Sequence, residues 1–439
     1  MKTFYCGHCG YLAFFENTVC GNCGSTLGFV PEEMDFGAFA IETDGRWRRL
    51  GEPRGDTHAW RPCRNYAVER VCNWMVQGAA EQLCCSCRHT EITPALRAPE
   101  NRERWRRLEG AKRRLFYSLY QLGLPVPRGG GGGDEVGLSF RFVEDDAWPP
   151  HVGAERGSGV ITLNLAEADG ARPAGSVAHR PESYRTVLGH LRHAVGHFYW
   201  DLLIADSPRL DAFRAKFGDE RRDYAEAAAA YERDGPPADW AERRISAYAA
   251  MHPLEDWAET LGHYLHVIDA LDTAAHWGFA LHSDQDDGGP ADLPGLGGTD
   301  LPFREVLIEQ WLPLSQFLDS MGRSFGEGDI YPFVIAPAVL DKLCFVNDVV
   351  AASRVGGTCG YGSENGVDAE GPAAAEVAKR ALPGPESPTA VDAGSAIPGA
   401  PPTTDEMSRA ADRAEGSAVD REKGRDKGSE KGRDKGVAG

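Results

Sequence analysis

Short cysteine pairs constrain this chain more than any other feature of its sequence. Cys6 and Cys9 are separated by two residues, and Cys20 and Cys23 repeat that spacing, with a glycine directly after each pair. Such a turn aims two sulfur atoms at one ion, and two turns complete a tetrahedral site. The pattern therefore predicts a four-cysteine metal site. We expect zinc there, and iron is the alternative because it also accepts four thiolates.

A second group of cysteines follows with looser spacing. Cys84 and Cys87 form another two-residue pair, and Cys63 and Cys72 can complete a second tetrahedron around a structural zinc ion. Cys85 leaves two interpretations open, because it can replace Cys84 as a ligand or be a spare thiol. The sequence thus predicts two cysteine sites in the first quarter of the chain.

The number and context of the cysteines favour metal over disulfides. The chain has 11 cysteines, an odd number, and no basic and apolar leader precedes the first pair. Short pairs in a chain without a secretory signal are typical of metal binding in the reducing cytoplasm, so we expect a cytoplasmic protein. Cys344 lies in an apolar helical run and is predicted to be a core residue, whereas Cys359 suggests no function.

Four regions differ in composition. Residues 1–35 hold the first cysteine site, 36–97 hold the second, 98–352 show mainly helical patterns, and 353–439 are rich in Ala, Gly, Pro and charge. The last region has almost no large apolar side chains to offset the entropy of ordering, so it is predicted to be disordered. We expect an α+β protein with a small β zinc ribbon, a mainly α-helical domain and a disordered tail.

The net charge limits the kinds of partner. A formal charge of −19 and a pI near 5.2 argue against membrane binding and wholesale nucleic-acid binding. Arginines nevertheless gather around the cysteine sites, and zinc ribbons with basic flanks can bind RNA, DNA or protein. We favour the simpler interpretation, that these arginines solvate helix faces, over nucleic-acid binding. They are Arg46, Arg48, Arg49, Arg61, Arg64, Arg70, Arg102, Arg104, Arg106 and Arg107.

Two histidines on a predicted helix indicate a third metal site. An apolar stripe at helical spacing predicts a helix over residues 183–204, and it consists of Leu191, Val195, Phe198 and Leu202. His193 and His197 lie one turn apart on this helix and can share one zinc ion. In the HExxH motif the residue after the first histidine is a glutamate that transfers protons. Here it is Ala194, whose methyl group cannot do so.

A third ligand is expected from a later helix, predicted over residues 254–271. Glu255 suits that role, and Glu259, one turn further on, can accept a hydrogen bond from a ligand imidazole. Tyr248 can direct its hydroxyl at the zinc-bound water or at a developing oxyanion. His190, on the same face as the two histidines, is an alternative ligand. A strand predicted over residues 160–165 precedes the site and is expected to be an edge strand that can pair with extended peptide.

Several stretches resemble a family of bacterial zinc-binding metallopeptidases with an N-terminal zinc ribbon. They are residues 184–201 around the two histidines, 245–248, 255–260 and 329–334, and the likeness covers residues 1 to about 350 with both cysteine sites. The peptidase core is similar to zincins with a glutamate ligand, including the lethal-factor type.

The resemblance implies a role for each candidate residue. It implies His193, His197 and Glu255 as zinc ligands, Glu259 as the partner of a ligand and Tyr248 as the transition-state partner. Ala194 departs from the family pattern, where a glutamate is the general base. The departure leaves metal binding intact and puts catalysis in question.

Three functions remain open at this stage. The first is peptide-bond hydrolysis by zinc-activated water, impaired because the general base is missing. The second is a pseudoenzyme that retains zinc and binds peptide. The third is an adaptor that binds protein or nucleic acid through its zinc ribbon. In each case ligand counting predicts about three zinc ions, with a peptide or protein as the favoured partner.

Overall fold

The computed structural model describes most of the chain up to Val355. The described residues are 1–43, 45–51, 60–77, 82–129, 137–144, 154–155, 157–169, 186–281, 291–292 and 301–355. Beyond Val355, the predicted disordered tail lies outside them, as does Cys359.

The N-terminal region is built from short strands, as predicted for a zinc ribbon. β1 (Phe4–Tyr5) pairs with β2 (Leu12–Ala13), and five further strands form an antiparallel sheet in the order β3-β4-β5-β6-β7. These are β3 (Thr26–Val30), β4 (Asp35–Ile41), β5 (Trp47–Arg49), β6 (Trp60–Pro62) and β7 (Met75–Gln77), with α1 (Arg64–Ala67) before β7. Because β3 precedes the second cysteine site and β7 lies within it, one sheet connects the two cysteine regions.

A second sheet lies ahead of the histidine helix and has the strand order β10-β11-β9-β8. Its strands are β8 (Thr90–Ile92), β9 (Ser139–Val143), β10 (Ala154–Glu155) and β11 (Val160–Asn164). The predicted strand is therefore present, but Leu165 already begins the 3-10 helix η2 (Leu165–Asp169). We expected this strand, β11, to lie at the edge of a sheet. That expectation is wrong for Val160 and Ile161, because they pair with β10 on one side of β11 and β9 pairs with β11 on the other side.

The rest of the described chain is mainly helical, which confirms the predicted fold class. The helices are α2 (Pro99–Gln121), α3 (Val187–Leu203), α4 (Leu210–Phe217), α5 (Tyr224–Asp234), α6 (Trp240–Arg243), α7 (Pro253–His276), α8 (Phe303–Glu305), α9 (Leu312–Ser324) and α10 (Pro337–Ala352). Shorter elements are η1 (Cys87–His89), η4 (Tyr248–Ala250), the π-helix η5 (Val306–Trp311), β12 (Ala280–Leu281) and β13 (Ala291–Asp292). None of the described helices has the length and apolar character needed to cross a membrane.

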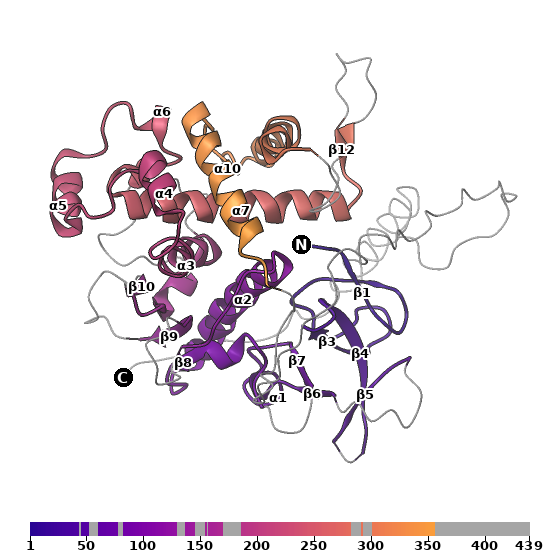
Figure 1. The fold of residues 1–439 in the computed structure, drawn as a ribbon. Helices are drawn as coiled ribbons and strands as arrows, with labels where there is room; N and C mark the ends of the chain where they lie inside the picture. Colours follow the sequence, from indigo (N-terminus) through magenta and orange to yellow (C-terminus); the bar gives the residue numbers. More distant parts are fainter. Residues whose placement is uncertain are drawn as a thin grey trace, which may run out of the picture. The chain divides into compact units, whose positions relative to one another are not determined.

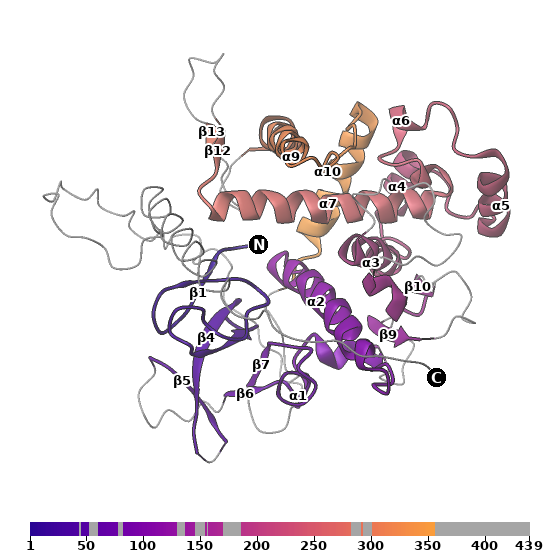
Figure 2. The ribbon, with the colours of Figure 1, turned by 180° about the vertical axis from the view of Figure 1, so that it is seen from behind.

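Helix α7 organises the helical region. It packs against α3, α4 and α10, as Figures 1 and 2 show. Its side chains at helical spacing, including Trp257, Leu261 and Leu265, are fully buried. Helix α2 contacts α3. Its apolar stripe, which contains Trp105 and Leu115, is also buried. Burial of these stripes holds α3 and α7 together, and these two helices carry the candidate metal ligands.

Candidate metal centre

The two helices that carry the histidines and glutamates begin at defined caps. The Thr186 side chain accepts a hydrogen bond of 3.0 Å from the Gly189 amide and starts α3. The His252 imidazole accepts one of 3.2 Å from the Leu254 amide at the start of α7, where Pro253 occupies the first helical position. These caps place Glu255 in the first turn of α7.

Close packing brings α3 and α7 together at Gly196. A Cβ atom added there would lie 2.7 Å from the Ala258 Cα atom, so only glycine permits this approach. The Trp257 indole also donates a hydrogen bond of 2.9 Å to the Gly196 carbonyl. The histidines of α3 therefore face the glutamates of α7 across a short gap.

Three candidate ligand side chains converge between these helices. The two Nε2 atoms of His193 and His197 lie 3.3 Å apart, and they lie 3.2 and 3.4 Å from the two carboxylate oxygens of Glu255. Atoms bound to zinc at about 2.0–2.1 Å in a tetrahedron lie about 3.3–3.4 Å from one another. Imidazole lone pairs and a carboxylate that face each other in a buried site need a proton or a metal cation between them. This group, which we call the His–His–Glu site, therefore fits zinc.

Further side chains hold these ligands in place. Glu259 Oε1 lies 2.7 Å from His193 Nδ1, which leaves Nε2 of that imidazole facing the site, and the Ser246 hydroxyl donates to the other Glu259 oxygen at 2.7 Å. The Tyr224 hydroxyl donates to Glu255 at 2.8 Å. Sequence reasoning gave neither hydroxyl group a role. Ser246 lies in the resembling stretch 245–248, but Tyr224 lies 31 residues before Glu255 and no motif marks it.

Burial and charge act in opposite directions on Glu255. Its burial would raise the pKa of the carboxyl, but the neighbouring His197 and His193 imidazoles hold that pKa well below its usual range. The carboxylate form, which is the form that binds metal, is therefore favoured.

Tyr248 lies beside the His–His–Glu site. Its ring centre is 6.0 Å from that of His193 and 6.1 Å from that of Tyr231. Burial and the Glu259 charge raise the pKa of Tyr231 to about 12, so this second tyrosine stays protonated at neutral pH. The structure thus brings together His193, His197, Glu255, Glu259 and Tyr248, all of which the sequence predicted as one site.

Two nearby side chains, those of the alternative ligand His190 and of Asp256, point elsewhere. His190 Nδ1 lies 2.7 Å from Glu167 in η2, and His190 is not in the convergent group. Asp256, which follows Glu255 in the sequence, is fully buried and contacts Lys342 at 2.7 Å and Arg244 at 3.1 Å. Burial raises the pKa of the Asp256 carboxyl to about 6. Ala194 is also buried, with 1% of its surface exposed.

The first cysteine site consists of Cys6, Cys9, Cys20 and Cys23, whose sulfurs come together as one group. The Cys6 and Cys23 sulfurs lie 3.8 Å apart, and those of Cys9 and Cys20 lie 3.6 Å apart. Sulfurs bound to one zinc at about 2.3 Å lie about 3.8 Å apart. A contact with Ser25 lowers the pKa of the Cys23 thiol to about 6, which favours the thiolate that binds metal.

The second cysteine site contains Cys63, Cys72, Cys84 and Cys87, all of them buried. The Cys72 and Cys84 sulfurs lie 3.8 Å apart, again the separation that a zinc ion imposes. Cys85 is buried but does not belong to this group, so the site uses Cys84 as its ligand. Cys344, predicted to be in the core, lies in α10 and is half-buried.

Carboxylates accompany many of the arginines near the cysteine sites. Arg102 contacts Glu69, Arg104 contacts Asp169, and Arg48 contacts Glu42, each at 2.6 to 2.9 Å. Similar pairs join Arg106 and Arg107 to Glu103 and Arg49 to Glu33. The basic residues of this region are thus largely balanced locally, in line with a solvating role rather than a nucleic-acid surface.

Comparison with known proteins decides the family. Residues 101–349, more than half of the chain, match the family described as "putative zinc-binding metallo-peptidase", and residues 3–98 match a zinc-ribbon domain. The chain belongs to this metallopeptidase family. Uncharacterized proteins of Mycobacterium bovis and of two strains of Mycobacterium tuberculosis are each 39% identical over 352 residues, covering 80% of this chain and 95% of theirs. No solved structure matches.

Family membership agrees with the three groups of ligands. Both cysteine sites lie within the zinc-ribbon match, and the His–His–Glu site lies within the metallopeptidase match. All three groups can bind zinc. A zinc metallopeptidase family also implies a peptide substrate.

Proposed function

We propose that this member of the metallopeptidase family hydrolyses peptide bonds slowly, because Ala194 occupies the position of the general-base glutamate. The convergence of His193, His197 and Glu255 at the separations required by zinc is the observation that carries this proposal. The family supports a peptide or protein as the molecule that the site binds.

The residues of the site divide the work of hydrolysis among them. His193, His197 and Glu255 would hold a zinc ion, which would supply Lewis acidity toward a water molecule and a peptide carbonyl. Glu259 orients His193, and the Tyr224 hydroxyl orients Glu255. Tyr248, whose ring contacts His193, donates a hydrogen bond from its hydroxyl to the oxyanion that develops on the carbonyl. No proton acceptor is available at Ala194, and loss of a general base typically costs about 10²- to 10⁴-fold in rate.

A domain that binds peptide without cleaving it is the second candidate function. It rests on the same alanine, because the remaining groups can hold zinc and a peptide carbonyl without moving a proton. An adaptor role for the zinc ribbon is less favoured, since carboxylates balance many of the arginines around it.

The test is to measure metal content and peptidase activity for the parent chain and its Ala194→Glu variant. We expect about three zinc ions in both proteins. We expect weak activity in the parent and roughly 100-fold or higher activity in the variant, sensitive to chelator. Ala194→Gln is the matched control, because it has nearly the same shape but cannot accept the proton.

Further variants separate the outcomes. In the Ala194→Glu background, Tyr248→Phe and His197→Ala should each remove the gained activity. High activity in the parent would contradict the proposal, because another base would then be at work. A folded, zinc-loaded Ala194→Glu protein that cleaves nothing in a broad peptide library would instead favour the binding function.

A further inference from the structure

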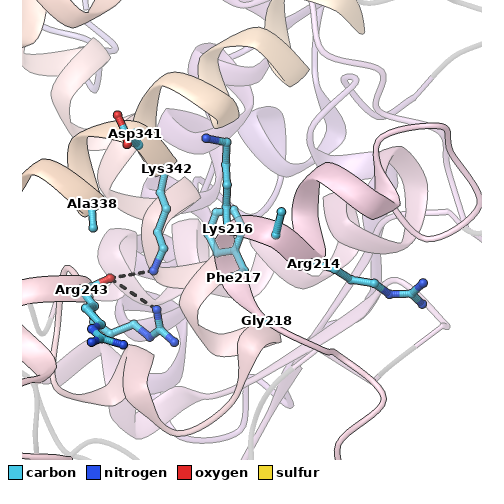
Figure 3. A pocket seen from close by; sticks show the side chains of 10 residues that line it. Arg214, Lys216, Phe217, Gly218, Arg243, Ala338, Asp341 and Lys342 are labelled. Atoms are coloured by element: carbon cyan, nitrogen blue, oxygen red, sulfur yellow. Dashed lines mark hydrogen bonds between the residues drawn. The ribbon is translucent and has the colours of Figure 1, made fainter.

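A pocket of about 470 Å³ lies beside the first turn of α7. Two of its lining residues, Arg244 and Lys342, contact Asp256, which follows Glu255 in that turn. The end of α4 with Gly218, the Arg243–Arg244 pair at the end of α6, and the first two turns of α10 form its walls (Figure 3). Gly218 lies against Pro253, the first residue of α7, because a Cβ atom on Gly218 would be 3.4 Å from the proline ring. The pocket therefore borders the helix that carries Glu255 without including any metal ligand.

The lining of this pocket is strongly cationic in a chain whose net charge is −19. Its walls include five basic side chains and one carboxylate, and the charged residues are Arg214, Lys216, Arg243, Arg244, Lys342 and Asp341. The carboxylate does little to balance them, since Asp341 forms an ion pair with Arg304 outside the lining.

The ion pairs of the five basic side chains do not neutralise all of their positive charge. Arg214 is paired with Glu220, and Arg243 only approaches Asp239, at 3.7 Å, where both side chains are exposed. Arg244 and Lys342 share a single carboxylate, Asp256. Lys216 forms no ion pair with any residue that the structure describes. One shared carboxylate and an unpaired lysine mean that the pocket has capacity for an anion.

Part of the pocket is held in position before any ligand binds. Lys342 is buried, with 3% of its surface exposed. Its ammonium group donates to Asp256 and to the Arg243 carbonyl at 2.7 Å each, and it lies 5.3 Å from the centre of the Phe217 ring. Helix α10 begins here without a side-chain cap, so the positive end of its dipole adds to the field. A buried, fixed cation with further exposed cations beside it suits a small, highly charged anion.

We propose that this pocket binds a small anion of the phosphate class, either free phosphate or the phosphoryl group of a larger molecule. Cations from three separate elements surround one volume, which suits a compact anion with oxygens in several directions better than a flat carboxylate. The ligand occupies a place separate from the metal centre, so this inference stands independently of peptide hydrolysis.

The experiment is calorimetric titration of the full-length, zinc-loaded protein with inorganic phosphate, with pyrophosphate and with succinate. We expect phosphate and pyrophosphate to bind, with affinity that falls as the salt concentration rises. We expect Lys216→Ala and Arg243→Ala each to weaken binding by about 10- to 100-fold. Both side chains are exposed, and Arg243→Ala keeps the backbone carbonyl that Lys342 uses, so both variants should fold.

A matched control uses another exposed arginine. Arg233→Ala removes the same charge from the end of α5, outside the lining, and should leave binding unchanged. Phosphate binding that survives in the Lys216→Ala/Arg243→Ala double variant would place the anion elsewhere, for example on zinc, and would overturn the proposal. Absence of phosphate and pyrophosphate binding would overturn it too. Succinate binding as tight as that of phosphate would make the pocket a carboxylate site.

Discussion

The His193 imidazole shows how single atoms define this metal centre. Its Nε2 atom lies 3.3 Å from His197 and 3.2 Å from Glu255, while its Nδ1 atom lies 2.7 Å from Glu259. An imidazole whose Nδ1 proton is directed to a carboxylate presents the Nε2 lone pair to the metal and becomes a better ligand. The ligand and its orienting carboxylate should therefore respond differently to mutation.

Replacement of the two glutamates tests that difference. Glu255→Ala removes a ligand, so we expect loss of zinc from the His–His–Glu site while both cysteine sites keep theirs. Glu259→Ala removes only the orienting carboxylate and should weaken zinc binding by about 10- to 100-fold. Metal content by mass spectrometry and chelator competition measure both effects. If Glu255→Ala keeps full occupancy, the third ligand has been assigned to the wrong residue.

Tyr224 should tune the same site through its hydroxyl. This group donates to Glu255 at 2.8 Å, so Tyr224→Phe is expected to reduce zinc affinity roughly tenfold without a change in fold. Tyr264→Phe is a matched control, because the Tyr264 hydroxyl also makes a hydrogen bond, to Asn347, but away from the metal. Equal zinc affinities for the two variants in chelator competition would show that the Tyr224 contact is unimportant.

At the scale of elements, the crossing of α3 and α7 sets the geometry of the centre. The two histidines come from one helix and both glutamates from the other, so the ligand separations depend on how closely the helices approach. Gly196 and Gly262 lie at this contact: a Cβ atom at Gly262 would lie 3.5 Å from the His193 amide nitrogen. Small residues at a helix crossing allow the backbones to come together.

Two glycine-to-alanine substitutions in helices distinguish the effect of helix propensity from the effect of close packing between helices. Gly196→Ala places a methyl group 2.7 Å from the Ala258 backbone, so we expect destabilisation of about 1–3 kcal/mol and weaker zinc binding. Gly110→Ala in α2 meets only the end of the Arg113 side chain, at 3.9 Å, and should stabilise by roughly 0.4–1 kcal/mol. Chemical denaturation of both variants measures these changes. Similar effects of the same sign would mean that the close approach at Gly196 does not matter.

On the scale of the whole molecule, α2 links the cysteine region to the helical region. The buried Arg113 side chain donates to the Val71 carbonyl at 2.7 Å, close to the second cysteine site. Further along α2, the Ser118 hydroxyl donates to Asp269 of α7 at 2.7 Å. Buried residues from both regions form one continuous apolar core around α2. The stability of each region should therefore depend on groups buried at this junction.

His89 provides a test of that dependence. It is 1% exposed, its Nδ1 atom contacts the Leu138 carbonyl at 2.8 Å, and its ring lies 5.0 Å from that of Phe116 in α2. Burial lowers the pKa of His89 to about 3, whereas an unfolded histidine titrates near 6.5. Between these values the unfolded chain holds more protons, so stability falls as the pH decreases below about 6.5.

The expected contribution of His89 is about 2 kcal/mol lost between pH 7 and pH 5. Zinc release from the cysteine sites also destabilises the protein in acid, so the comparison with His89→Leu isolates the histidine. The variant should show a shallower loss of unfolding free energy over this range in denaturant titrations. Identical pH slopes for the parent and the variant would show that His89 does not titrate as its burial predicts.

Local patterns were sufficient to mark the residues that form the three candidate metal groups. Cysteine pairs, histidines one turn apart and glutamates on a later helix are each encoded by short spacings, and the structure gathers them into three groups. The mainly helical domain followed from periodicity, since a stripe such as that containing Trp105 and Leu115 specifies its own helix, whereas the small β region was expected from the cysteine pairs. Spacing alone did not decide whether Cys84 or Cys85 completes the second site, and the structure places Cys84 in the group.

Contacts between distant residues were decided only by the tertiary structure. The Tyr224 hydroxyl on Glu255 and the pairing of β11 with β10 join segments that no local pattern relates. The cationic pocket gathers the ends of three helices, and its Lys342 comes 86 residues after its partner Asp256. A spacing rule describes one helix or one turn, whereas these groups meet because apolar stripes on separate helices bury one another and thereby fix which helix ends lie side by side.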